Sequence, residues 1–167
     1  SEPALDIDNT GNLFPGIVIL DDISIHSTSS NYSVILEGVD AEISGLDLSG
    51  DGGGMYWGAR GSLPSRISNS VIWDSPSDCI ELVSHTELLA DGVSLICDEI
   101  PEIDQSSVNF TGSSLATRSG STSTFSLSNN SHLRWISSGD ILTPQSSEDD
   151  VIADVMWMVD VLSLIHI

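Results

Sequence analysis

Residues 67–73 read Ile-Ser-Asn-Ser-Val-Ile-Trp, and 22 positions later residues 89–95 read Leu-Ala-Asp-Gly-Val-Ser-Leu. When the two segments are superimposed, apolar residues fall on apolar residues and Asn69 falls on Asp91. Strands stacked in a solenoid produce this pattern, because alternate side chains point inward and pack on the same positions of the neighbouring coil. Asn, Asp and Gly are favoured at the corner between two strands, where the backbone takes a left-handed conformation.

A pair of apolar residues separated by one residue recurs along the chain, at successive spacings of 23, 25, 22, 15 and 25. The pairs are Ile23/Ile25, Leu46/Leu48, Val71/Trp73, Val93/Leu95, Val108/Phe110 and Leu133/Trp135. We expect both members of each pair to point inward, Val71 and Trp73 included. The spacing of 15 indicates one shortened coil, and residues 112–124, rich in Ser, Thr and Gly, are expected to form a loop. Together the pairs predict an all-β, parallel solenoid of five to six coils.

Two consecutive stretches also carry a family resemblance. Residues 66–74, Arg-Ile-Ser-Asn-Ser-Val-Ile-Trp-Asp, are followed by Ser-Asp-Cys-Ile-Glu-Leu at residues 77–82. This pattern resembles the repeat of right-handed parallel β-helix proteins, a group that includes pectate-lyase-like enzymes and many non-catalytic surface proteins. The resemblance covers residues 14–142 and implies a right-handed parallel β-helix. It does not identify an activity, because these proteins share a backbone and not a site.

The domain organisation follows from changes in composition along the chain. We expect residues 1–13 to be an entry segment or the remnant of a preceding coil, and residues 14–142 to form the β-helix. Residues 143–150 are predicted to be a linker, and the alternating residues 151–161 the first strand of a truncated β-sandwich-like module. The last six residues, 162–167, match the translation of a transposon-end sequencing adapter, so we expect a non-native tail on a metagenomic fragment.

The charge balance limits the partners of the protein. The chain has 25 acidic residues, four arginines and no lysine, for a formal net charge of −21. Such a surface repels nucleic acid and anionic membranes, and it also repels a polyanionic substrate unless metal ions bridge the two. The sequence contains no predicted membrane span. Its 31 serines and its many small polar residues are typical of secreted proteins, which predicts an extracellular or cell-surface location.

Cys79 and Cys97 are the two cysteines of the chain. An even count permits one disulfide, but the two cysteines are too close in sequence to share one column of a solenoid with a period near 23. The spacing therefore leaves open whether they pair or are two buried apolar residues. No metal site is predicted, because CxxC is missing and the histidines show no ligand spacing.

An enzyme built on this fold would need clustered carboxylates. A hydrolase requires two or three of them at one glycosidic bond, and a lyase requires carboxylates for calcium together with a basic residue that removes a proton. The candidate residues are Asp47, Asp51, Asp74, Asp78, Arg60 and Arg66. Asp51 and Asp74 are separated by one period of the repeat, which would stack them on neighbouring coils. With 25 acidic residues in the chain, such coincidences are expected by chance.

Aromatic residues suggest a second kind of site. Tyr56, Trp57 and Trp73 would form a platform for sugar rings if exposed, and would be core residues if they point inward. Alternation places Trp73 inward and leaves Trp57 open, with the core favoured. Tyr56 and Trp57 are therefore the carbohydrate-binding candidates.

Two functions remain. The favoured one is a non-catalytic segment of a large secreted or surface protein that acts as a spacer or as an adhesion surface for glycans. The alternative is a fragment of a polysaccharide lyase or glycoside hydrolase. Expected partners are extracellular polysaccharides, other cell-surface components and neighbouring domains of the same parent chain. No cofactor is assigned, with calcium left open.

Overall fold

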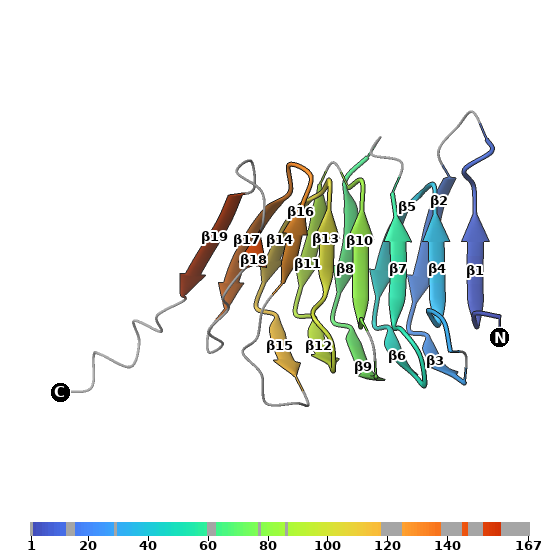
Figure 1. The fold of residues 1–167 in the computed structure, drawn as a ribbon. Coiled ribbons are helices and arrows are strands. Elements are labelled where there is room, and N and C mark those ends of the chain that lie inside the picture. Colours follow the sequence, from blue (N-terminus) through green and yellow to red (C-terminus); the bar gives the residue numbers. More distant parts are fainter. Residues whose placement is uncertain are drawn as a thin grey trace.

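The computed structural model describes residues 2–12, 16–28, 30–59, 63–76, 78–85, 87–117, 125–137, 145–146 and 152–157. Its regular structure in these ranges consists of β-strands, which form three parallel sheets in a β-solenoid of about five turns (Figure 1). This architecture confirms the all-β parallel solenoid predicted from the apolar pairs. The described part of the chain holds no helix that could cross a membrane.

Each of the first five coils contributes one strand to each sheet in turn. Sheet A contains β1 (Leu5–Asp8), β4 (Val34–Glu37), β7 (Met55–Gly58), β10 (Ile80–Val83), β13 (Glu102–Asp104), β16 (Ser126–Ser128) and β18 (Gln145–Ser146). Sheet B contains β2 (Gly16–Asp21), β5 (Val39–Ser44), β8 (Ser65–Ser68), β11 (Leu88–Asp91), β14 (Ser107–Thr111), β17 (His132–Ser137) and β19 (Ile152–Trp157). Sheet C contains β3 (Ser24–Ser27), β6 (Asp47–Gly50), β9 (Val71–Ser75), β12 (Ser94–Cys97) and β15 (Ser114–Thr117).

The core consists of apolar ladders inside the three sheets. In sheet A the ladder is Ile7, Leu36, Trp57, Leu82, Ile103 and Leu127. In sheet B it is Leu20, Ile43, Ile67, Ala90, Phe110 and Trp135. In sheet C it is Ile25, Leu48, Ile72, Leu95 and Leu115. From the second coil onward these side chains are almost completely buried, because stacked coils cover the inward faces of one another.

Residues with a left-handed backbone mark the corners between sheets. At the corner from sheet B to sheet C the positive-φ residues are Asp22, Gly45, Asn69, Gly92 and Gly112. The prediction that Asn69 occupies a corner is confirmed. In the next coil, however, Gly92 occupies this corner, and Asp91 is the last residue of β11.

The coil offset in this region is longer by one residue than the offset read from the sequence. Pairing of β8 with β11 places Ile67 opposite Ala90, whereas the sequence superposition placed it on Leu89. Because the side-chain period of a strand is two, an offset error of one residue exchanges the two faces. Ile72 is the buried residue of β9, whereas Val71 is 37% exposed and Trp73 is 39% exposed. The prediction that Val71 and Trp73 point inward is therefore wrong.

The one short spacing between apolar pairs has two causes. The pair ending at Leu95 lies in sheet C, whereas the pair ending at Phe110 lies in sheet B, so this spacing compares two different sheets. The coil itself is also short, because the step from Leu95 to its partner Leu115 is smaller than the step from Ile72 to Leu95.

The loop expected over residues 112–124 is wrong in part. Ser114–Thr117 form β15, which pairs in parallel with β12 as a further rung of sheet C. Residues 118–124 lie outside the described ranges. A sequence rich in Ser, Thr and Gly can still form a strand here, because Leu115 provides the one inward apolar side chain that the ladder needs.

Buried serines satisfy backbone groups at the corners. The backbone N–H of Leu46 donates to Ser70 Oγ at 3.1 Å, and that of Val93 donates to Ser113 Oγ at 3.1 Å. Each bond joins adjacent coils, and both serines are buried. A hydroxyl at this position thus replaces the strand hydrogen bond that a corner interrupts.

Strands lie in both terminal segments as well. β1, within residues 1–13, pairs in parallel with β4, and β19 pairs in parallel with β17 as a further rung of sheet B. The assignment of residues 151–161 to a following module stays a prediction. Within the expected linker, residues 143–150, only β18 is described, and the expected tail, residues 162–167, lies outside the described ranges.

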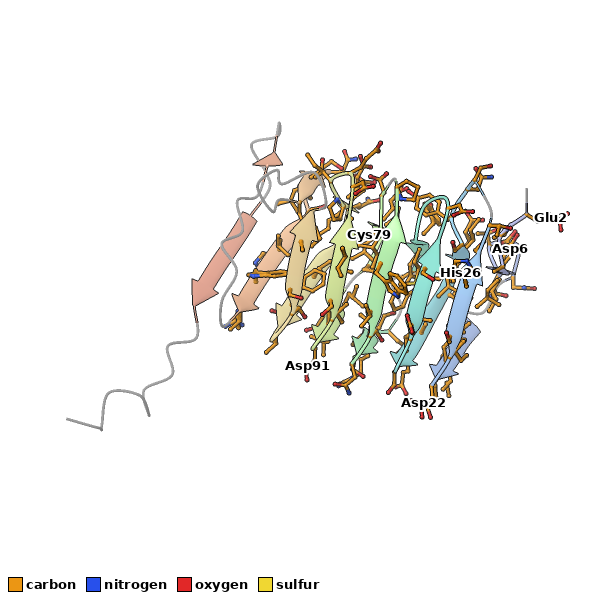
Figure 2. All side chains as sticks on the ribbon, turned by 90° about the horizontal axis from the view of Figure 1, so that it is seen from below. Glu2, Asp6, Asp22, His26, Cys79 and Asp91 are labelled. Atoms are coloured by element: carbon orange, nitrogen blue, oxygen red, sulfur yellow. A yellow bond between two sulfur atoms is a disulfide. The ribbon has the colours of Figure 1, made fainter. Side chains whose placement is uncertain are left out.

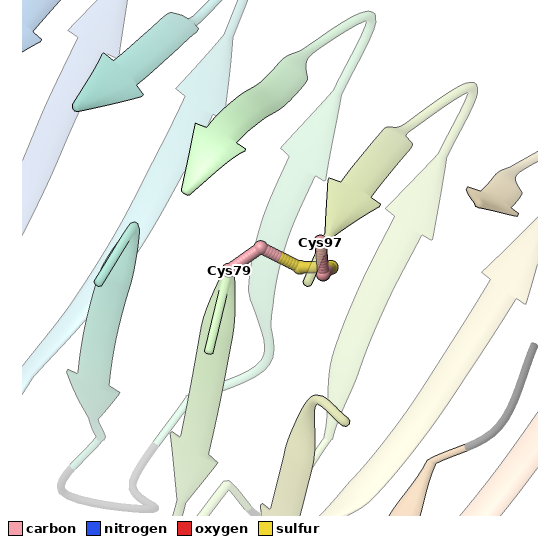
Figure 3. Close-up of a disulfide and its surroundings, with 2 residues drawn as sticks. All are labelled: Cys79 and Cys97. Carbon is pink, nitrogen blue, oxygen red and sulfur yellow. A yellow bond between two sulfur atoms is a disulfide. The ribbon is translucent and has the colours of Figure 1, made fainter. Parts of the chain in front are cut away.

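Cys79 and Cys97 form a disulfide with a Cα–Cα distance of 5.2 Å (Figure 3). Cys97 ends β12 in sheet C, while Cys79 directly precedes β10 in sheet A. The bond therefore crosses the corner between sheets C and A and links two adjacent coils. The sequence spacing left this pairing open, because it considered only cysteines stacked at the same position of neighbouring coils. The two half-cystines instead occupy different positions around the coil.

Candidate functional site

The structure distributes the predicted catalytic residues over two sheets and one corner. Asp47 points outward from β6 in sheet C, whereas Asp51 and Asp78 lie in adjacent coils at the corner between sheets C and A. Arg66 points outward from β8 in sheet B. The structure thus brings Asp51 and Asp78 to one corner and places the arginine on another sheet.

Two candidates have no described side chain. Asp74 lies on β9, and only its backbone is described, while Arg60 lies outside the described residues. Among the side chains that are described, no three His, Cys, Asp or Glu residues lie close enough together to hold a metal ion.

Asp78 is the candidate with the most unusual electrostatics. Partial burial raises its pKa to about 6, and the negative charges of Glu102, Glu99 and Glu81 add to the effect. The nearby Tyr32 hydroxyl opposes part of this increase in pKa. A carboxyl group that titrates near neutral pH can hold a proton and transfer it to a leaving group.

A pair of tyrosines lies next to this carboxyl group. The rings of Tyr32 and Tyr56 are 5.8 Å apart, and Tyr32 Oη donates a hydrogen bond of 2.6 Å to Glu81. Burial and the charge of Glu81 raise the pKa of Tyr32, while burial and the charge of Glu37 raise that of Tyr56. Tyr32 was missed at the sequence level because it lies in a loop, far along the chain from its partner Glu81.

The ring of Tyr32 fits against the backbone at Gly53. A Cβ atom at this position would lie 2.7 Å from the ring of Tyr32, closer than side chains approach one another. Gly53 precedes Gly54 in a run of glycines between β6 and β7. The run therefore allows an aromatic ring to pack directly on the chain, a function that the sequence reading did not assign to it.

A groove with a volume of about 260 Å³ opens beside Tyr56 on the outer face of sheet A. We call it the tyrosine groove; its main lining residues are Thr10, Glu37, Tyr56, Gly58, Val83 and Ser84. Glu37, Gly58 and Val83 are register neighbours on β4, β7 and β10. The outward side chains at this register would form a row across the three strands. Because Gly58 has no side chain, the row is interrupted between Glu37 and Val83, and this gap forms the floor of the groove.

Trp57 is a core residue. It is completely buried, its indole N–H donates to the carbonyl of Val39 at 3.3 Å, and its ring meets His85 edge-on at 4.8 Å. Burial lowers the pKa of His85 to about 4, so this imidazole is neutral at physiological pH. Trp57 therefore lies in the core, which was the favoured alternative, and its ring is not accessible to a ligand.

Trp73, unlike Trp57, is exposed. Its indole N–H donates to Asp47 Oδ1 at 2.6 Å, which fixes the orientation of the ring. Val71 and Ile96 are also exposed on sheet C, and we call these three residues the sheet C patch. A register irregularity between β9 and β12 lies at this point. Such bulges reorient a side chain relative to the regular strand.

Arg66 and Arg134 are the arginines of the described ranges, and both belong to sheet B. They border a groove of about 310 Å³ whose floor includes Leu89 and Asn109. Asp91 also lines the sheet B groove, so two arginines and one aspartate face that groove, whereas Glu37 is the charged lining residue of the tyrosine groove in sheet A. The two grooves therefore differ in charge and would suit different ligands.

No protein-family model, curated protein or solved structure matches this chain. The parallel solenoid architecture rests on the strand pairing itself. The candidate sites rest on the geometry of the tyrosine groove, the sheet C patch and the corner at Asp78.

Proposed function

We propose that this chain is a non-catalytic β-solenoid segment of a large secreted or cell-surface protein, and that it binds a neutral polysaccharide in the tyrosine groove. The groove beside Tyr56 is the observation that carries this proposal. It combines an aromatic ring, a carboxylate and hydroxyl groups in a space of about 260 Å³. Ligand sites in general combine an apolar surface with a few polar groups of this kind.

The side chains that line the groove could each contact a bound sugar. The phenol ring of Tyr56 offers a flat apolar surface to the C–H face of a pyranose. The Glu37 carboxylate accepts hydrogen bonds from sugar hydroxyls, and the hydroxyls of Thr10 and Ser84 can donate or accept. Because the carboxylates that surround Tyr56 are negative, they favour a neutral sugar over a uronic acid.

The role as a spacer is supported by the continuous core. A solenoid distributes its stability over the contacts between neighbouring coils, so it can hold a binding surface at a fixed distance from an anchor. The Cys79–Cys97 disulfide supports an oxidising compartment, as expected for a secreted or surface location.

Isothermal titration calorimetry of the full chain against neutral and uronic-acid oligosaccharides tests the proposal. We expect a neutral oligosaccharide to bind, and Tyr56→Ala to weaken its affinity by about tenfold through loss of the stacking surface. Tyr56→Phe keeps the ring and should remain within about twofold of the wild type. Trp73→Ala removes an exposed aromatic residue from another sheet and should bind as the wild type does. Absence of binding to every neutral oligosaccharide, or equal affinity of Tyr56→Ala, would contradict the proposal.

A second candidate function, a fragment of a polysaccharide-active enzyme, is supported by one observation. The pKa of about 6 at Asp78, beside Glu81 and Glu102, is suited to a general acid. For either function we propose that the coils are right-handed and that the chain belongs to the right-handed parallel β-helix proteins, a group that includes both pectate-lyase-like enzymes and non-catalytic surface proteins. Release of reducing ends from the same oligosaccharides tests the enzyme. Asp78→Asn should abolish this release without weakening binding, whereas no release by the wild type would eliminate the enzyme.

A further inference from the structure

The two arginines of the described ranges occupy one row on the outer face of sheet B. Strand pairing aligns Arg66 of β8 and Arg134 of β17 with Leu89 of β11 and Asn109 of β14 at one register position. All four side chains point outward, because the residue that follows each of them belongs to the inward ladder of sheet B. We call these four residues the arginine row. Further strands flank the row on both sides, since β8 also pairs with β5 and β17 also pairs with β19.

Both arginines of the row are exposed, although the chain as a whole is strongly acidic. Neither guanidinium group forms an ion pair with another residue of the described ranges. Acidic residues follow at the same register position on both sides, Glu42 on β5 next to Arg66 and Asp154 on β19 next to Arg134. The row therefore attracts a ligand whose negative charges are confined to the positions of the two arginines.

The sheet B groove of about 310 Å³ lies along the arginine row. Asp91 and Thr111 line it from the next outward position of β11 and β14. Figure 2 shows Asp91 at the same edge of the stack as Asp22, where sheet B turns toward sheet C. Neighbouring strands are about 4.8 Å apart, so the Cα atoms of the two arginines, three strands apart, are separated by about 14 Å along the solenoid axis.

The order of residues in the row distinguishes two kinds of acidic ligand. An extended polypeptide advances about 3.4 Å per residue, so acidic residues at positions i and i+4 are about 14 Å apart and match the two arginines. An apolar residue at position i+2 then lies over Leu89 and Asn109. A polyuronate has a carboxylate on every ring, which would place unpaired negative charges over Leu89 and beside Asp91. The row therefore favours a peptide with separated carboxylates over an acidic polysaccharide.

We propose that the arginine row binds an extended segment of a partner protein, which crosses the strands of sheet B and has Asp or Glu at positions i and i+4 and an apolar residue at i+2. The two guanidinium groups bind the carboxylates through charge-assisted hydrogen bonds, and Leu89 contacts the apolar residue. The Asn109 amide and the Thr111 hydroxyl bind backbone groups of the segment. Positions i−2 and i+6 face the acidic positions beside the row, which favours Lys there. This protein contact is separate from the tyrosine groove of sheet A.

The test uses a fluorescent peptide, Lys-Thr-Glu-Thr-Leu-Thr-Glu-Thr-Lys, titrated with the full chain at low salt and followed by fluorescence anisotropy. The side-chain charges of this peptide cancel, so general repulsion by the acidic chain is small. We expect saturable binding that Arg66→Gln and Arg134→Gln each weaken by about fivefold, because each removes one charged hydrogen-bonded contact. The double variant should weaken binding by about twentyfold.

Three controls separate the row from general effects. Ile96→Glu makes the same change in net charge on the exposed face of sheet C and should bind the peptide within about twofold of the wild type. Tyr56→Ala should leave peptide binding unchanged, and Arg66→Gln/Arg134→Gln should leave binding of neutral oligosaccharides unchanged, so failure of either proposal is distinguishable from failure of the other. Thermal unfolding of each variant checks that it remains folded.

A second peptide tests the spacing on the wild-type protein. Lys-Thr-Leu-Thr-Glu-Thr-Glu-Thr-Lys has the same composition, but its acidic residues are only about 7 Å apart, so it should bind about fivefold more weakly. Absence of saturable binding, equal binding of the two peptides, or equal binding by Arg66→Gln/Arg134→Gln overturns the proposal, as does an equal loss in Ile96→Glu. A uronic-acid oligosaccharide that displaces the first peptide and binds more tightly would assign the row to an acidic polysaccharide and overturn the proposal as well.

Discussion

Asp78 and His85 both have shifted pKa values because burial removes hydration from the charged form. For the Asp78 carboxyl group this raises the pKa to about 6, and for the His85 imidazole it lowers the pKa to about 4. Both changes favour the neutral side chain at the positions that these residues occupy. His85 packs against the core residue Trp57, whereas Asp78 lies at a corner among other carboxylates.

Replacement of Asp78 by asparagine should stabilise the protein in a pH-dependent manner. The folded-state pKa of about 6 exceeds the ordinary value of 3.8, so the folded state binds this proton more tightly than the unfolded state. This residue's contribution to the free energy of unfolding therefore falls as the pH rises from about 4 to about 6. At pH 7.5 we expect Asp78→Asn to gain about 1 kcal/mol, a value reduced for the solvent screening of a half-exposed group.

Urea unfolding at pH 7.5 and pH 3.5 measures this effect. Near pH 3.5 the wild-type carboxyl group is largely protonated in both states, so most of the gain should disappear. Asp51→Asn, at an exposed aspartate of the same corner, is the control and should show little change at either pH. An equal gain from Asp78→Asn at both pH values would show that burial of the charge is not the cause.

At the scale of single elements, the corners set the geometry of each coil. Five residues with positive φ recur between sheets B and C, and three of them are glycines. The Asn69 corner could be predicted from the sequence, because asparagine tolerates the left-handed region. The coil offset could not be predicted, because Ile67 meets an apolar residue whether it is superimposed on Leu89 or on its actual partner Ala90.

Replacement of Gly45 by alanine should destabilise the corner between β5 and β6. Gly45 has a φ of 65°, and an added Cβ would lie 2.5 Å from Asp22 Oδ1 in the preceding coil. We expect a loss of about 1–3 kcal/mol in the free energy of unfolding, measured with urea. Gly11→Ala, where an added Cβ meets nothing within 4 Å, should remain within about 0.5 kcal/mol of the wild type. Similar values for the two variants would refute the role of the corner.

For the whole molecule, stability depends on contacts between coils rather than on any single strand. The apolar ladders run through all three sheets, and the disulfide adds a covalent link between adjacent coils. A net charge of −21 opposes this compact state through repulsion.

Removal of the disulfide by Cys79→Ser/Cys97→Ser should lower the free energy of unfolding by about 3 kcal/mol, because a closed loop of this length restricts the unfolded chain. Urea unfolding with and without dithiothreitol measures the change. Dithiothreitol should destabilise the wild type by a similar amount and leave the double variant unaffected. A wild type that does not respond to the reductant, although its thiols become accessible to titration, would contradict a stabilising cross-link.

The sequence by itself determined the parallel solenoid architecture, because recurring apolar pairs and corner residues are local features that every coil repeats. It also identified Tyr56, which lines the candidate groove. The tertiary structure decided which tryptophan is exposed: Trp57 lies in the core and Trp73 on the surface. The physical reason is the two-residue period of a strand, since a shift of one residue between coils exchanges inward and outward faces without altering the apolar pattern.

The tertiary structure also decided the contacts that cross corners. Tyr32 reaches Glu81, and Cys79 pairs with Cys97, although neither pair shares a column of the repeat. Coil lengths vary, so sequence separation does not specify which residues meet at a corner. These contacts form only when the coils are stacked, because they depend on the path of the connecting segments rather than on the strands themselves.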